Sequence, residues 1–65
     1  MNETEKLKHL LEHWIEHNNA HTKTYLEWAS KAELTGKKEL AKILRQIASE
    51  TKKQDELFKK ALKTA

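Results

Sequence analysis

Apolar residues recur every three or four positions along most of the chain, in two series separated by a short break. The first series covers residues 7–32 and the second covers residues 40–61. This spacing keeps side chains on one face of an α-helix, which has 3.6 residues per turn. The pattern therefore predicts two helices, over about residues 3–34 and 37–63.

The residues at the predicted helix ends agree with these boundaries. Asn2 is a suitable N-cap for the first helix, and Glu5 follows it by three residues, as in a capping box. Gly36 suits the left-handed conformation that commonly follows a helix C-terminus. Because so short a link brings two helices together in opposite directions, we expect an all-α, antiparallel two-helix hairpin. The 65 residues (1–65) are expected to form this single helical-hairpin domain.

The two apolar series define the expected seam between the helices. Its residues are Leu7, Leu11, Trp14, Asn18, His21, Tyr25, Trp28 and Ala32 from the first helix, and Leu40, Ile43, Leu44, Ile47, Thr51, Gln54, Phe58 and Ala61 from the second. A second apolar stripe runs beside this seam on each helix. It consists of Ile15, Thr22, Leu26 and Ala29, and of Ala41, Leu44, Ala48 and Leu62.

Two helices alone seldom bury enough apolar surface for a stable fold. We therefore expect the second stripe to pack on another copy of the chain, giving a four-helix bundle or a larger homo-oligomer, with a dimer favoured. A monomeric hairpin is the alternative.

Composition narrows the possible classes of protein. The absence of cysteine excludes disulfides and thiolate metal ligands, and the absence of proline together with a single glycine disfavours turn-rich sheets. No apolar run approaches the ~20 residues of a membrane span, and the N-terminus has no signal-peptide core. The expected location is the cytoplasm.

The net charge of +3 is divided unevenly, with −2 on residues 1–35 and +5 on residues 36–65. Eight basic residues form the outward face of the second helix: Lys38, Lys42, Arg45, Lys52, Lys53, Lys59, Lys60 and Lys63. Such a ridge could contact an anionic partner. Aromatic residues do not interleave it and it has one arginine, so nucleic-acid binding is not expected and a solvated face is the simpler interpretation.

All four histidines form one row, His9, His13, His17 and His21, each four residues after the last. Residues four apart are neighbours on a helix face, so an adjacent pair could bind one metal ion. One straight helix does not bring three consecutive histidines to a single ion, because the outer two are about 12 Å apart along the axis at ~1.5 Å per residue.

Polar residues interrupt both helices of the predicted hairpin at the same level: His17, Asn18 and His21 on the first, and Glu50, Thr51 and Gln54 on the second. Burying polar groups costs free energy unless they pair or bind something. His13, His17, His21 and Glu50 are therefore candidate ligands for a divalent transition metal such as Zn²⁺, Ni²⁺, Co²⁺ or Fe²⁺. His9 is a further candidate, although it lies furthest toward solvent.

Other interpretations of these residues remain open. His21 could be a structural histidine bonded to Glu50 or Gln54, and a histidine on a helix surface can simply be solvated. The chain has no H-E-x-x-H motif, no Glu-x-x-His pairs, no nucleophile with a base beside it and no glycine-rich phosphate loop. Catalysis therefore has little support in the sequence.

The segment from His13 to Asn18 (HWIEHN), followed by residues 25–29 (YLEWA), resembles a small His-rich, two-helix family of archaea and bacteria. Members of that family stand alone or are attached to proteins that handle nickel or cobalt. The resemblance implies metal handling, with His13, His17 and His21 as ligands and a metal-handling protein as a possible partner. Asn19 and Thr22 stand where acidic residues are common after this motif, so the charge around the site differs.

Taken together, the sequence predicts a helical protein that binds a divalent transition metal for storage, sensing, delivery or structure. The alternative is a metal-free helical interaction module, with an anionic partner on the basic face of the second helix.

Overall fold

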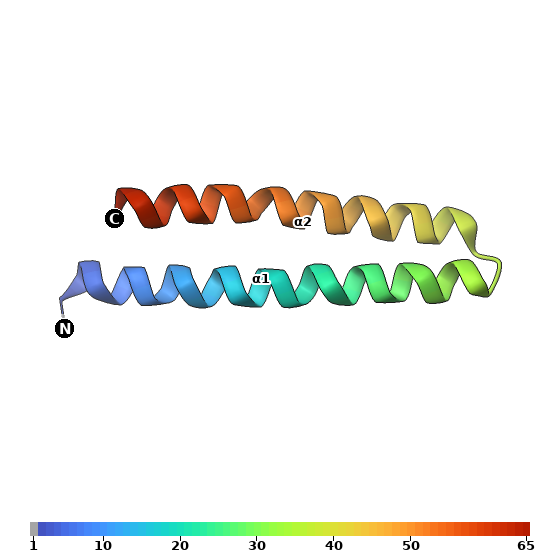
Figure 1. Ribbon diagram of the computed structural model, residues 1–65, viewed down its shortest axis with the longest axis horizontal. Coiled ribbons are helices and arrows are strands. Elements are labelled where there is room, and N and C mark those ends of the chain that lie inside the picture. The colour runs from blue at the N-terminus through green and yellow to red at the C-terminus, as the bar shows by residue number, and fades with distance from the viewer. Residues whose placement is uncertain (1) are drawn as a thin grey trace.

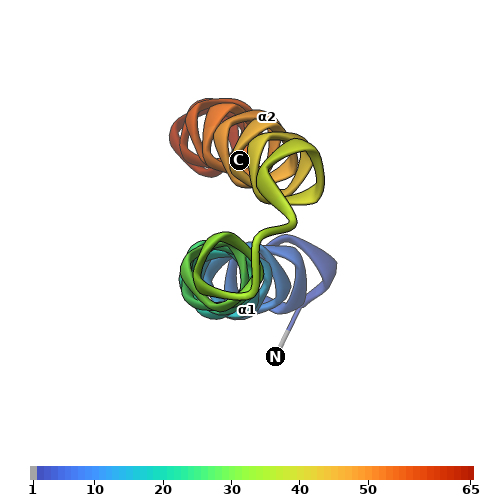
Figure 2. The same ribbon diagram turned by 90° about the vertical axis from the view of Figure 1, so that its right-hand side faces the viewer.

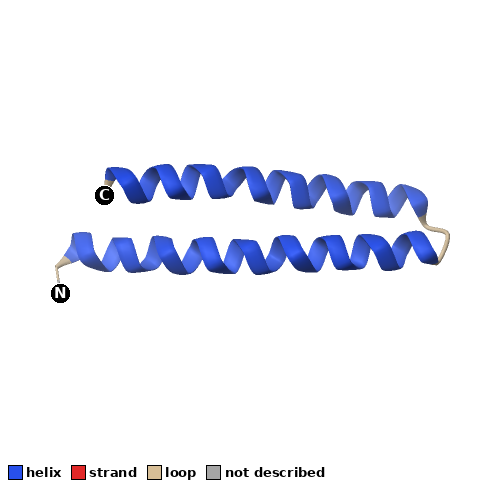
Figure 3. Cartoon of the chain, viewed as in Figure 1, coloured by secondary structure: helices blue, strands red, loops and turns tan. Residues whose placement is uncertain are grey.

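A computed structural model describes residues 2–65 and shows two antiparallel α-helices joined by a short turn (Figure 1). Helix α1 spans Glu3–Leu34 and helix α2 spans Lys38–Thr64. The two chain ends lie at the same end of the hairpin, and the described residues outside the helices form the connection and the termini (Figure 3). The predicted all-α hairpin is confirmed. The bounds of α1 agree with the prediction, and α2 is displaced by one residue.

The ends of α1 have the predicted caps. The side-chain Oδ1 of Asn2 accepts a hydrogen bond of 2.8 Å from the backbone N–H of Glu5. At the other end Gly36 adopts φ +84°, its N–H donates to the carbonyl of Glu33 (3.0 Å), and the N–H of Lys37 donates to the carbonyl of Ala32 (2.9 Å). These two bonds form a Schellman motif, which satisfies the last carbonyls of α1 and reverses the chain.

The helices meet along residues that alternate three and four positions apart. This seam contains Leu11, Ile15, Asn18, Thr22, Tyr25, Ala29 and Ala32 from α1, and Ala41, Leu44, Ala48, Thr51, Asp55, Phe58 and Leu62 from α2, all buried or half-buried. The most completely buried members are Ala29, Ala41 and Ala48. Small side chains let two helices approach closely, but each buries little apolar surface.

The seam predicted from the sequence is wrong for about half of its members. Trp14 and Trp28 are exposed, and so are Leu7, Leu40, Ile43 and Ile47. The stripe expected to contact another copy instead forms much of the hairpin core, except for Leu26, which is exposed. At ~100° per residue, both helices are rotated by roughly 60° from the predicted pairing. Alanines line the observed seam, so the helices approach through their smallest apolar side chains.

This rotation leaves the largest apolar side chains on one broad side of the hairpin. We call this side the tryptophan face; its apolar residues are Leu7, Leu10, Trp14 and Trp28 from α1, and Leu40, Ile43, Ile47 and Leu57 from α2. The end-on view shows two helices side by side, and no third element covers either broad side within residues 2–65 (Figure 2). An apolar surface of this kind commonly marks an interaction site.

The opposite broad side is polar. There the guanidinium Nη2 of Arg45 lies 2.6 Å from the Oε2 of Glu33 in an exposed ion pair between the helices. An exposed pair contributes ~0–1 kcal/mol to stability. Neither helix has a stretch apolar enough and long enough to cross a bilayer, in the part of the chain described.

Candidate functional site

Three of the four histidines form a column of rings along α1. The ring centroids of His13 and His17 are 5.9 Å apart, and those of His17 and His21 are 4.6 Å apart, edge to face. The column continues to Tyr25, whose ring centroid lies 6.0 Å from that of His21. These contacts follow from the four-residue spacing, which places successive rings one above the other on one helix.

His17 and His21 are the most suitable pair for a shared ion. Their rings are the closest in the column, and metal–nitrogen bonds of ~2.0–2.1 Å require the two donor nitrogens to approach one point. Both side chains are exposed, so an ion can reach them. His21 follows Trp14 and precedes Trp28 by seven residues, which places it on the tryptophan face between them.

His13 and His9 lie progressively further round α1 from this pair. At ~100° per residue, His13 points toward the outer side of the helix and His9 points toward the polar broad side. His13 can approach His17 but not the ion that His17 and His21 would share, because consecutive steps rise ~6 Å along the axis. The site predicted from the sequence therefore reduces, on geometry, to one pair of histidines.

Glu50 lies on α2 at about the level of His21, but it does not join the histidines in a cluster. Its Oε1 is 3.7 Å from the ammonium nitrogen of Lys53, one turn along the same helix, and both groups are exposed. Across the described residues, no three side chains of the histidine, aspartate and glutamate types come together as a metal site. A single chain thus offers two imidazoles, and further ligands for a four-coordinate ion have to come from elsewhere.

A partly buried polar contact joins the helices beside this pair. The side-chain amide nitrogen of Asn18 donates to the carbonyl of Thr51 (2.7 Å) and to Oδ1 of Asp55 (2.8 Å). Asp55 is only 5% exposed. The hydroxyl of Thr51 donates along α2 to the carbonyl of Ile47, so it is also satisfied. Of the six polar residues predicted for this level, Asn18 and Thr51 lie in the seam, whereas His17, His21, Glu50 and Gln54 are exposed.

Asp55 was not among the residues predicted for this layer. The spacing of Asp55 could have identified it as a seam residue, because it follows Ala41 and Ala48 and precedes Leu62 at intervals of seven. Such a position faces the partner helix, and a charged residue there has to be paired. The carboxylate at this level that contacts Asn18 is therefore Asp55, whereas the sequence had suggested Glu50.

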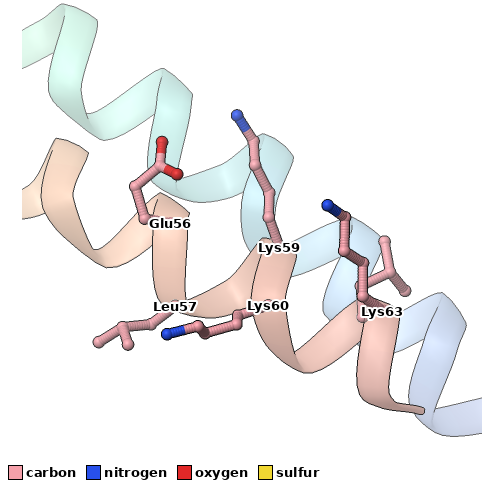
Figure 4. A pocket seen from close by; sticks show the side chains of 6 residues that line it. Glu56, Leu57, Lys59, Lys60 and Lys63 are labelled. Carbon is pink, nitrogen blue, oxygen red and sulfur yellow. The ribbon is translucent and has the colours of Figure 1, made fainter.

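The basic ridge of α2 ends in a shallow hollow lined by Glu56, Leu57, Lys59, Lys60, Leu62 and Lys63 (Figure 4). Lys59 and Lys63 extend to one side of the helix, whereas Lys60 lies along Leu57 on another side (Figure 4). The ammonium groups do not converge on one point. This geometry suits a solvated face and offers no formed anion site.

Comparison with known proteins places the chain in a family. It is 45% identical over 58 residues to an uncharacterized protein of the archaeon Archaeoglobus fulgidus, an alignment that covers 89% of this chain and 92% of the relative. No solved structure matches the chain. Residues 7–65 match the family described as a domain of unknown function, DUF8180. The expected membership of a small family without an assigned function is confirmed, and metal association in that family stays a prediction. The chain belongs to the DUF8180 family.

Proposed function

We propose that this protein binds a divalent transition metal through the imidazoles of His17 and His21. The observation that carries the proposal is the 4.6 Å separation of these two rings on one exposed helix face. Imidazole nitrogen is a good ligand for Zn²⁺, Ni²⁺, Co²⁺ and Fe²⁺. Storage, sensing, delivery and a structural ion all use such a pair, and catalysis is not part of the proposal.

The remaining sequence-predicted ligands lie outside the proposed pair. His13 contacts His17 from the next turn and can accept the ion as it enters or leaves. Glu50 stays a predicted candidate on the same broad side as the pair, whereas His9 is turned away from the pair and is not needed by this proposal.

We further propose that the chain self-associates through the tryptophan face, as a dimer that forms a four-helix bundle. The most completely buried residues of the hairpin core are alanines, while Trp28 is 54% exposed and Ile43 is 47% exposed. Burial of apolar surface contributes ~25 cal/mol per Å², so covering these larger side chains supplies stability that the alanine seam lacks. The face differs from the one predicted from the sequence, but the reason for expecting an oligomer is the same.

A metal-free interaction module is the second candidate function. The tryptophan face favours it, because a face of this kind supports association with or without an ion. An anionic partner on the α2 lysines, a metal-handling protein partner and the cytoplasmic location stay predictions.

The experiment that separates the two functions is calorimetric titration of chelator-treated protein with Zn²⁺, Ni²⁺ and Co²⁺ at pH 7.5. We expect micromolar or tighter binding by the native chain and by the control variant His9→Ala, and at least tenfold weaker binding by His17→Ala/His21→Ala. At pH 5.5 binding should weaken, because a protonated imidazole has no lone pair for a metal.

Circular dichroism should show the same helix content in all three proteins, because the three replaced histidines are exposed and alanine favours helix. Unchanged metal affinity in the double variant would refute the proposed site. Association that persists in a protein without metal affinity would favour the interaction module.

A further inference from the structure

The proposed histidine pair lies on the tryptophan face, which is also the side of the hairpin proposed for self-association. His17 and His21 lie near the middle of α1, which spans Glu3–Leu34, and large apolar side chains flank them toward both ends. On α2, Glu50 and Gln54 occupy the same middle level between Ile47 and Leu57. The tryptophan face therefore has a polar middle between two apolar ends.

We infer that a second copy of this chain completes the metal site, so that one ion is bound between two chains by His17 and His21 of each. This inference rests on the proposed metal binding and names the partner that supplies the missing ligands. One chain brings together no group of three candidate ligands within the described residues, whereas two pairs supply the four nitrogens of a tetrahedral site.

The size of the face matches that of a dimer interface. The hairpin measures 51 × 16 × 10 Å. Its broad side thus covers roughly 800 Å², which is about the area that each partner contributes to an interface of standard size.

The distribution of charge distinguishes the two broad sides. Between residues 7 and 61, the outward positions of the tryptophan face carry two charged residues, Lys31 and Glu50. Lys31 lies over the ring of Trp28, with its ammonium nitrogen 4.3 Å from the ring centroid. The opposite broad side carries many charges: Glu12, Glu16, Lys23, Glu33, Lys42, Arg45, Lys52, Glu56 and Lys59. Depletion of charge is typical of the buried centre of an interface.

The face is also complementary to itself. A two-fold axis that crosses α1 between His17 and His21, at right angles to the helices, places α1 on α1 of the second copy in the antiparallel sense. The two histidine pairs then lie opposite each other. Counting outward from the axis, Trp28 lies opposite Leu10 of the second copy.

The same axis produces matching pairs on α2. Ile47 lies opposite Leu57 of the second copy, and the carboxylate of Glu50 lies opposite the amide of Gln54, which can donate a hydrogen bond to it. Three of these pairs, Trp28 with Leu10, Ile47 with Leu57 and Glu50 with Gln54, match in polarity, whereas Trp14 lies opposite Thr24 and Leu7 opposite Lys31. A different protein would need the same pattern at the same spacing.

Native mass spectrometry of the intact chain, loaded with Ni²⁺ or Zn²⁺ after chelator treatment, tests the shared site directly. We expect a dimer that carries one ion. A dimer with two ions, or a monomer with one, would overturn the shared site and leave the proposed metal binding intact. Absence of any metal-bound species would overturn the proposed function itself.

A pair of variants tests the link with association. Trp28→Gln/Ile43→Gln removes two apolar side chains of the tryptophan face and leaves both histidines in place. Leu26→Gln/Leu34→Gln is the matched control. Leu26 is as exposed as Ile43, at 47%, but Leu26 and Leu34 both lie off the tryptophan face. In sedimentation velocity the first variant should be monomeric. In calorimetric titration it should bind Ni²⁺ at least tenfold more weakly, and the control variant should match the native chain in both measurements.

A monomeric Trp28→Gln/Ile43→Gln protein with native Ni²⁺ affinity would contradict the shared site. If circular dichroism shows that this variant loses helix content, the number of ions per dimer of the native chain, from native mass spectrometry, decides alone whether the site is shared. Glu50→Gln identifies the ligands: four imidazoles predict less than a threefold change in affinity, and a tenfold loss would replace this ligand set with one that includes the carboxylate.

Discussion

Asn18 and Asp55 connect the two helices through a partly buried hydrogen bond of 2.8 Å. The amide of Asn18 also donates to the backbone of Thr51, so both of its N–H groups have acceptors on α2. A buried carboxylate is costly unless it is paired, and this one has a partner in a single register of the two helices. The contact thus specifies which residues of α1 and α2 face each other.

Replacing one member of this contact should cost more than replacing both. Asn18→Leu leaves the carboxylate of Asp55 in an apolar seam, and we expect a loss of ~1–3 kcal/mol in the free energy of unfolding. The double variant Asn18→Leu/Asp55→Leu should recover most of that loss, because no unpaired polar group remains. Urea denaturation of the native chain, both single variants and the double variant measures the coupling. Additive effects of the two single changes would contradict this role.

At the scale of the element, the turn at Gly36 fixes how α1 passes into α2. Gly36 has φ +84°, and a Cβ atom added there would meet no other atom within 4 Å. The cost of a side chain is therefore conformational rather than steric, since L-residues disfavour this region.

We expect Gly36→Ala to lower the free energy of unfolding by ~1–2 kcal/mol, which is the penalty for an L-residue in the left-handed conformation. Gly36→Asn should cost less, because asparagine tolerates that conformation. Thermal unfolding followed by circular dichroism measures both variants at one protein concentration. Equal stability of the alanine and native proteins would show that the Schellman turn contributes nothing to the hairpin.

The helices and their caps could be predicted from the sequence, because periodicity, Asn2 and Gly36 are local signals. The rotation of the helices could not. Two apolar series, the predicted seam and the observed seam, overlap on each helix and share residues such as Leu11 and Phe58. Periodicity shows that both series are apolar, but not which one faces the sister helix and which one faces outward.

The error in the seam came from assigning the largest side chains to the hairpin core. In a two-helix hairpin the core is a narrow strip, and alanines fill it here at Ala29, Ala41 and Ala48. The candidate site shows the same difference between local spacing and helix rotation. The four-residue spacing predicted the contact between His17 and His21, whereas the distance of Glu50 from them depends on helix rotation.

At the scale of the whole molecule, the hairpin has a small core and a large exposed apolar face. Stability that comes from an interface depends on concentration, because dissociation and unfolding are linked. The lone chain should be marginally stable, and the assembled chains should be considerably more stable.

The melting temperature should therefore rise with protein concentration. A hundredfold increase in concentration changes the free energy of dimer dissociation by about 2.7 kcal/mol, which corresponds to a rise of roughly 5–10 °C for chains of this size. Adding Ni²⁺ should raise it further, since the ion binds the folded state. Scanning calorimetry over that range measures the effect, and a melting temperature independent of concentration would show that the hairpin is stable alone.

The most direct test of metal binding by the histidine pair is the visible absorption spectrum of Co²⁺ added to chelator-treated protein. Two imidazole pairs around one ion predict the intense bands of four-coordinate Co²⁺, reaching a plateau at one ion per two chains. These bands should be absent from His17→Ala/His21→Ala. A spectrum unchanged from that of the aqueous ion would contradict metal binding at this site.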